Sequence, residues 1–139
     1  MNLLRLFLRL ASVARAGIAV AAIGAAEASP ATPDQSQALV VYLKLSDADM
    51  GATGETFALY EVEDALEAAV SKVGTLDGHE IGGGYFTIYV YGRNARLMWD
   101  AAQSALRNPL IRRGSYVVLE SAVGKGAKTR FELPLPQGK

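Results

Sequence analysis

The segment YFTIYVYG at residues 85–92 alternates in chemical character from one residue to the next. Phe86, Ile88 and Val90 are apolar, whereas the odd-numbered positions carry tyrosine or threonine. Because successive side chains of a β-strand point to opposite faces, this pattern predicts a strand with one apolar face and one tyrosine-bearing face. A strand of this kind must pack its apolar row against a second layer. The segment therefore constrains the chain to a sheet that is covered on one side.

Other segments share this strand character. Residues 38–45, 115–121 and 128–135 are rich in β-branched and aromatic residues, which favour strands. Residues 75–84 predict a short edge strand followed by a glycine-containing turn.

Two intervening segments have helical periodicity. Apolar residues recur at steps of three and four over 56–73 and over 94–108, which predicts two helices with one buried stripe each. In the second helix we expect Leu97, Ala101 and Ala105 to face inward, with Met98 and Leu106 as further candidates. Asn94 is a favourable N-cap residue for it.

The order of elements is therefore strand, helix, strand, strand, helix, strand, with a short additional C-terminal strand. This βαββαβ order predicts an α+β, ferredoxin-like two-layer sandwich, with two helices on one face of an antiparallel sheet. We expect a single domain of this type over residues 38–139.

The face that the helices leave bare is a candidate interface. If the aliphatic residues meet the helices, the alternation within each strand places Tyr42, Lys44, Tyr85, Tyr89, Tyr91, Tyr116 and Val118 on the bare side. Monomeric proteins seldom leave such a patch uncovered, and tyrosine suits an interface because its ring packs while its hydroxyl hydrogen-bonds. The pattern predicts docking of a protein partner or of a second copy, as a homodimer. In the alternative interpretation, the tyrosines are good strand formers that pair across a two-sided sheet.

Nucleic acid is a poor candidate for this face. Aromatic sheet faces do stack single-stranded bases. However, the chain has a formal net charge of zero, and the basic residues expected near the tyrosines are only Lys44 and Arg130.

The turn DGHEIGGG suggests a weaker alternative site formed by Asp77, His79 and Glu80. It would make the chain a small enzyme or a small-molecule binder. Adjacent residues of a strand point to opposite faces, so His79 and Glu80 are poorly placed to act together. The pattern favours a solvated histidine in a hairpin.

The composition argues against several kinds of site. The chain has no cysteine and one histidine, which excludes a thiolate zinc site, a catalytic thiol and a disulfide framework. The acidic loop 46–55 lacks the glycine and glutamate positions of a calcium loop, and GKGAK at 124–128 lacks the spacing of a phosphate loop. We therefore expect no metal, no cofactor and no catalytic residue.

The N-terminal segment has the layout of a secretory signal peptide. Arginines at its start precede an uncharged run over residues 16–26, and Ala26-Glu27-Ala28 has the small-x-small pattern that signal peptidase cleaves. We expect a signal peptide over 1–28, a linker over 29–37 and a periplasmic or secreted protein that is free of the membrane after cleavage. Two alternatives remain. The segment could lie on a membrane surface as an uncleaved helix, or the start could be assigned too early, which would leave a cytoplasmic domain.

The turn and the strand that follows it also carry a resemblance. The chain resembles a group of small bacterial domains of unassigned function, which share an Asp-Gly-x-Glu-x-Gly turn and a strand that ends in Tyr-Gly before a capped helix. The corresponding residues here are Asp77, Gly78, Glu80, Gly82, Tyr91, Gly92 and Asn94, with Asn94 where an aspartate is commoner. The resemblance covers 38 to about 135. It implies a ferredoxin-like sandwich and brings no activity with it. Since such domains often lack an N-terminal extension, it also favours the alternative of a start assigned too early.

Overall fold

The computed structural model describes residues 36–136. The predicted signal peptide, 1–28, and most of the predicted linker lie outside the described residues. Gln37, which was assigned to the linker, is the first residue of a strand.

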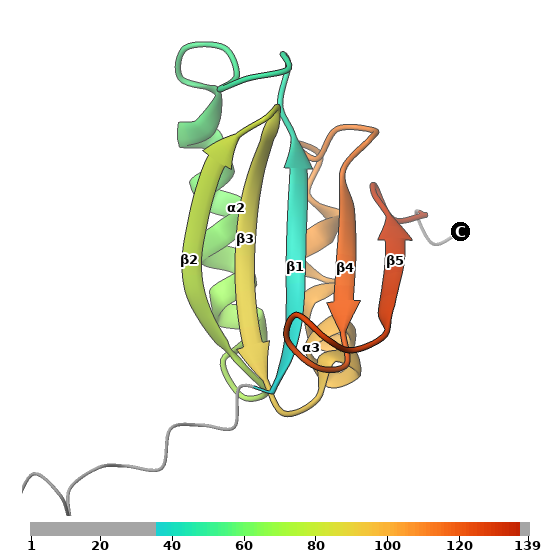
Figure 1. Cartoon of the computed structure of the whole chain (residues 1–139). Coiled ribbons are helices and arrows are strands. Elements are labelled where there is room, and N and C mark those ends of the chain that lie inside the picture. The colour runs from blue at the N-terminus through green and yellow to red at the C-terminus, as the bar shows by residue number, and fades with distance from the viewer. Residues whose placement is uncertain (1–35, 137–139) are drawn as a thin grey trace, which may run out of the picture. The chain divides into compact units, whose positions relative to one another are not determined.

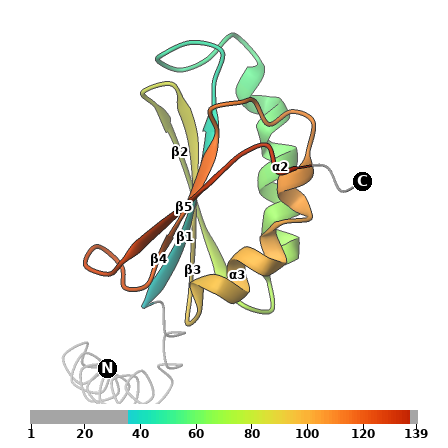
Figure 2. The ribbon, with the colours of Figure 1, turned by 90° about the vertical axis from the view of Figure 1, so that its right-hand side faces the viewer.

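The described chain forms one sheet and two α-helices (Figure 1). In chain order the elements are β1 (Gln37–Lys44), α2 (Glu55–Val70), β2 (Thr75–Gly82), β3 (Tyr85–Gly92), α3 (Ala95–Ala102), the 3₁₀ turn η1 (Ala105–Arg107), β4 (Tyr116–Glu120) and β5 (Lys128–Glu132). The sheet is antiparallel throughout, with the strand order β2-β3-β1-β4-β5. Figure 2 shows that both helices lie against the same face of the sheet.

This architecture confirms the predicted α+β two-layer sandwich. Its strand count and order differ from those of the four-stranded ferredoxin-like arrangement, because β5 continues the sheet beyond β4. β2 is also longer than expected and forms the opposite edge of the sheet.

The core lies between the helices and one face of the sheet. The sheet residues in it alternate along each strand, and α2 contributes a stripe at steps of three and four, as predicted. The fully or almost fully buried members include Leu39, Val41, Leu43, Phe86, Ile88, Val90 and Val117 from the sheet and Leu59, Val62, Leu66 and Val70 from α2.

The second helix is rotated and shortened relative to the prediction. Leu97 is 52% exposed, so its expected inward orientation is wrong. Met98 and Leu106, the two further candidates, are buried as expected. Trp99, which was not among the candidates, is also buried, and its ring stacks on Phe131 of β5 at a centroid distance of 4.4 Å. Because an indole buries more apolar surface than a leucine side chain, this contact sets which face of α3 turns inward.

The glycine run explains the tight connection between β2 and β3. Gly83 and Gly84 form a two-residue turn, and both have positive φ angles, 59° and 82°, which favour glycine. Gly84 also touches the loop that precedes α2. Its N–H donates to the Asp49 carbonyl at 2.8 Å, and a Cβ at this position would lie 2.9 Å from the Asp47 carbonyl oxygen.

Candidate functional site

The side of the sheet opposite the helices, hereafter the open face, carries all of the predicted interface residues. Tyr42 of β1 lies opposite Thr87 of β3 and Tyr116 of β4, and the same register aligns Lys44 with Tyr85. Register partners share a face of a sheet, so these side chains lie together. Each of the seven is half-buried rather than fully exposed: Tyr42, Lys44, Tyr85, Tyr89, Tyr91, Tyr116 and Val118.

Three rings, those of Tyr42, Tyr85 and Tyr116, form a contact cluster, here called the tyrosine cluster. Tyr42 and Tyr116 stack with centroids 4.5 Å apart and planes inclined by 16°. Tyr85 meets both rings edge-on, at 6.0 Å from Tyr42 and 5.7 Å from Tyr116. These are favourable aromatic geometries, so the three rings stabilise one another.

Two cations lie over these rings. The Lys44 amino group is 4.9 Å from the Tyr85 centroid, and the Arg130 guanidinium is 3.6 Å from that of Tyr116. Both contacts are within cation–π range. Arg130 was expected near the tyrosines but was not counted among the interface residues. Its pairing with Val118 places it on the open face.

Two small residues of the central strand lie on the open face. Ala38 and Val40 of β1 have exposures of only 1% and 6%, although both helices lie on the other side of the sheet. Tyr89, which is opposite Val40 in β3, and Val118, opposite in β4, flank it. The larger side chains of the neighbouring strands therefore shield these two residues from solvent.

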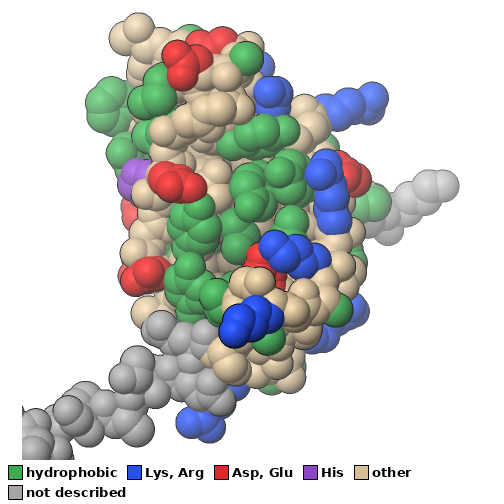
Figure 3. Space-filling model, in the orientation of Figure 1, with side chains coloured by type: hydrophobic (Ala, Val, Ile, Leu, Met, Phe, Trp, Pro, Cys, Tyr) green, Lys and Arg blue, Asp and Glu red, His purple; other side chains and the backbone are tan. Residues whose placement is uncertain are grey.

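Charge is distributed unevenly across the open face. Figure 3 shows acidic side chains on the β2 side, hydrophobic ones in the centre and mostly basic ones on the β4–β5 side. Lys128 pairs with Glu120 at 2.8 Å, and the lysine side chain is 60% exposed against 13% for the glutamate. The cation is therefore the group that solvent or a partner meets there.

Three tyrosines of the open face have raised pKa values. The pKa of Tyr89 is raised because its hydroxyl donates a hydrogen bond to the Glu80 carboxylate. Burial raises the pKa of Tyr91 and of Tyr116. None of these phenols is therefore poised to ionise and act as a nucleophile or base near neutral pH. They can pack against a partner and donate hydrogen bonds to it.

The weaker predicted site does not converge. His79 lies on the helix side, where its Nδ1 is 2.9 Å from the Glu63 carboxylate and its ring stacks on Phe86 at 4.5 Å. Glu80 lies on the open face, and Asp77 is exposed at the irregularity between Leu76 and Gly78. The expectation of a solvated histidine is wrong, since 26% of the side chain is exposed and it has an acidic partner.

Glu63 is a residue that the sequence reasoning missed. It follows Val62 in α2 and so flanks the buried stripe of that helix. Its position beside the buried stripe indicates that the carboxylate lies near the sheet. Its pairing with His79 spans 16 residues and depends on how α2 packs on β2.

The acidic loop before α2 uses its carboxylates internally. Asp47 accepts hydrogen bonds from the backbone N–H groups of Asp49 and Gly51, which lower its pKa. Glu55 accepts from the Ser46 hydroxyl and N–H and from the Ala52 N–H. Within residues 36–136, no group of three or more potential ligands could hold a metal ion.

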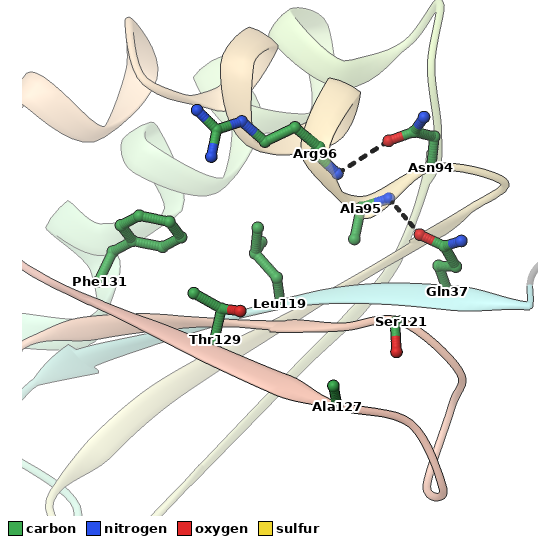
Figure 4. A pocket seen from close by; sticks show the side chains of 9 residues that line it. All are labelled: Gln37, Asn94, Ala95, Arg96, Leu119, Ser121, Ala127, Thr129 and Phe131. Atoms are coloured by element: carbon green, nitrogen blue, oxygen red, sulfur yellow. Dashed lines mark hydrogen bonds between the residues drawn. The ribbon is translucent and has the colours of Figure 1, made fainter.

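A pocket of about 250 Å³ lies between the start of α3 and the β4–β5 strands (Figure 4). It is lined by Gln37, Asn94, Ala95, Arg96, Leu119, Ser121, Ala127, Thr129 and Phe131. A helix N-terminus can bind an anion through free N–H groups. Here the Ala95 N–H donates to the Gln37 side chain at 2.8 Å, and Asn94 accepts from the next two N–H groups. Those donors are already used, so the pocket offers a ligand less than the open face does.

Comparison of the chain with protein-family models, with curated proteins and with solved structures finds no match. In the part of the chain that the structure describes, every helix is too short or too polar to cross a membrane.

Proposed function

We propose that the chain is an exported, non-catalytic interaction module that binds a protein partner through its open face. The observation that carries this proposal is the continuous surface of half-buried tyrosines across β3, β1 and β4, which neither helix covers. We also propose that β2-β3-β1-β4 with α2 and α3 form a ferredoxin-like unit, to which β5 is added.

The organisation of the tyrosine cluster supports binding. Tyrosine and arginine are enriched among the residues that dominate protein interfaces. Stacking of Tyr42 on Tyr116, with Arg130 above, holds these side chains in one arrangement before binding. Less side-chain entropy is then lost when a partner docks.

The chemistry of the same residues supports a non-catalytic role. The pKa values of Tyr89, Tyr91 and Tyr116 are raised, and Lys128 and Arg130 beside them are paired with Glu120 and Glu132. His79, the single histidine of the chain, has its Nδ1 against Glu63 on the opposite side of the sheet. Tyrosine rings with hydroxyl donors and paired charges are sufficient for a surface that binds a protein without catalysing a reaction.

Position-specific photo-crosslinking in the producing cells tests the proposal. A photoreactive phenylalanine analogue replaces Tyr85 on the open face or, as the control, Phe57, which is 73% exposed on α2. We expect a crosslinked protein adduct from position 85 and little or none from position 57. The absence of an adduct, or equal adducts at both positions, would overturn the proposal.

The exported state has its own test. Mass spectrometry of the isolated protein is expected to find Ser29 as the first residue, because the small-x-small site ends at Ala28. A chain that retains residues 1–28 would contradict export by signal cleavage.

A further inference from the structure

We propose that the outer edge of β5 is a second binding site, which takes an extended segment of a partner protein as an additional strand of the sheet. The inference goes beyond the proposed function, because it concerns the edge of the sheet and not its open face. It rests on the backbone groups of β5, on the side chains that flank them and on the pocket beside the strand.

The edge of β5 presents a row of outward backbone groups. The Leu133 N–H donates to the Ser115 carbonyl at 2.9 Å, and hydrogen-bonded pairs recur at every second residue of an antiparallel ladder. The N–H and C=O groups of Lys128, Arg130 and Glu132 therefore point away from β4. Among the described residues β5 is the last strand of the sheet, so no further strand pairs with these groups. Such a row is a template for another strand.

The two long cations of β5 do not cover this edge. The Lys128 amino group reaches Glu120 of β4 at 2.8 Å, and the Arg130 guanidinium lies 3.6 Å from the centroid of Tyr116, also in β4. Both side chains therefore lean over β4, away from the outer side of β5. The chain that follows β5 leaves the edge as well, because Leu133 belongs to the hydrophobic core. The backbone of the edge is thus accessible.

The opposite edge of the sheet is less suited to pairing. The register of β2 with β3 shifts between Leu76 and Gly78, and Gly78 has a φ angle of 125°. An irregularity of this kind bends an edge strand and interrupts its ladder. By contrast, β5 pairs with β4 in one unbroken register from Lys128 to Glu132. The β5 edge is therefore the better template for an added strand.

The pocket beside β5 can take one side chain of the added strand. It lies where the helix layer ends, because α3 packs mainly on β1, β3 and β4. Figure 4 shows Leu119, Thr129 and Phe131 pointing from the sheet toward α3. The volume of about 250 Å³ is below the roughly 300–1,000 Å³ of small-molecule sites, so a single large side chain suits the pocket.

These features define the chemistry of the partner segment. Residues that lie opposite each other in neighbouring strands share a face, so the partner residue opposite Thr129 points toward the helix side. A large apolar residue at that position contacts Leu119 and Phe131 in the pocket. Its two neighbours point to the open face, beside Lys128 and Arg130. Main-chain hydrogen bonds then provide affinity and the pocket provides specificity, as is usual when a peptide adds to a sheet edge.

A second copy of this chain fits the description poorly. The large apolar residue of its β5 is Phe131, whose ring already stacks on Trp99 of the same chain at 4.4 Å. Its other edge strand, β2, is interrupted by the register shift. Neither edge strand of a second copy therefore supplies the segment, and the partner is another protein.

Selection from a phage-displayed library of short random peptides, with the purified protein as the target, tests the inference. We expect the selected peptides to be rich in strand-forming residues and to share one large apolar position. A synthetic peptide of the selected sequence is then titrated against the protein by fluorescence polarisation. If no peptide is selected, or if the selected peptides share no apolar position, the inference is wrong.

Two variants of Arg130 separate the backbone from the side chain. Arg130→Pro removes the outward N–H, and an edge strand tolerates proline where the N–H faces solvent. Arg130→Ala is the matched control, because it removes the same side chain and keeps the N–H. We expect the proline variant to bind the synthetic peptide about tenfold more weakly than the alanine variant, since one hydrogen bond is lost and the ring hinders pairing. Equal affinities would overturn the inference.

Two variants of Thr129 test the pocket without any change to the backbone. Thr129→Phe fills the pocket and should weaken binding of the peptide about tenfold, whereas Thr129→Val keeps the volume of the side chain and should bind like the wild type. Equal binding by these two variants would contradict the role of the pocket. Circular dichroism establishes that each variant is folded.

Tyr85→Ala distinguishes the edge from the open face. If this variant abolishes binding of the synthetic peptide while Arg130→Pro binds as well as Arg130→Ala, the peptide lies on the open face and the edge is not a binding site. The crosslinking test of the proposed function uses position 85 and no peptide. Failure of one proposal is therefore distinguishable from failure of the other.

Discussion

Tyr42 and Tyr116 lie directly opposite each other in neighbouring strands, and their rings stack at 4.5 Å on the side of the sheet that the helices leave bare. A stack in this position contributes little to the hydrophobic core, which is formed on the other side of the sheet. The stack instead fixes the relative positions of two rings on the open face. The relationship between these two residues links the register of the sheet to the proposed docking function.

Removal of one ring should loosen this surface without unfolding the chain. Tyr42→Ala loses one stacked and one edge-on contact, so we expect a loss of about 1–2 kcal/mol in the free energy of unfolding. Tyr42→Phe keeps the ring and should be within about 0.5 kcal/mol of the wild type. Urea denaturation measures both values. An equal loss for the two variants would show that the hydroxyl, and not the stack, matters.

The turn between β2 and β3 gives a matched pair of glycine substitutions. Gly83→Ala meets nothing within 4 Å and should incur only the cost of a positive φ angle, about 1 kcal/mol. Gly84→Ala has the same type of φ angle and also places Cβ 2.9 Å from the Asp47 carbonyl oxygen, so it should be clearly more destabilising. Denaturation midpoints compare the two variants. Equal destabilisation would mean that the contact with the acidic loop is unimportant.

The alternating segment 85–91 allowed the two faces of the central strands to be predicted, because strand alternation is a local property of the chain. All seven interface candidates lie on the open face for this reason. The helical stripe of α2 was predictable on the same basis. In both cases the periodicity of one segment carries the information that places its side chains.

The features that were missed depend on contacts between distant segments. The rotation of α3 follows from Trp99 stacking on Phe131, which lies two strands later in the chain. The pairing of His79 with Glu63 needs α2 to pack on β2. The position of Arg130 over Tyr116 depends on the register of β4 with β5. A single-sequence pattern does not record such tertiary geometry.

The lowered pKa of Glu55 predicts that the free energy of unfolding falls at acid pH. Hydrogen bonds from Ser46, with others from the loop backbone, lower the pKa of Glu55 below its ordinary value of about 4.5. A lowered pKa in the folded state stabilises the fold above about pH 4.5, and this contribution is lost as the pH falls through the folded value. Urea denaturation from neutral to acid pH should show this fall. Glu55→Gln should reduce stability by about 1–2 kcal/mol at neutral pH and flatten the acid dependence.

The control for Glu55 is the exposed Glu67 of α2. Glu67→Gln should leave the free energy of unfolding at neutral pH nearly unchanged. If the two variants behave alike, the loop carboxylate does not hold the segment before α2 in place.

The raised pKa of Tyr89 predicts that the free energy of unfolding falls at alkaline pH. Its hydrogen bond to Glu80 raises its pKa above the ordinary value of about 10. The folded state then holds the phenolic proton more tightly than the unfolded state, so this stabilisation is complete below about pH 10 and is lost at higher pH. Ultraviolet titration of tyrosinate should show a late-ionising step, to which Tyr89 contributes together with Tyr91 and Tyr116, whose pKa values are also raised. That late step should move to lower pH in Glu80→Gln, and an unchanged titration would contradict the contact.

Oxidative footprinting in living cells tests most directly whether the open face is covered. Hydroxyl radicals label exposed side chains, and the labelling of Tyr85 can be compared with that of Phe57, which is 73% exposed on the helix side. We expect the ratio of Tyr85 to Phe57 labelling to be several-fold lower in cells than in the dilute purified protein. A ratio that is the same in both conditions would contradict a docked open face.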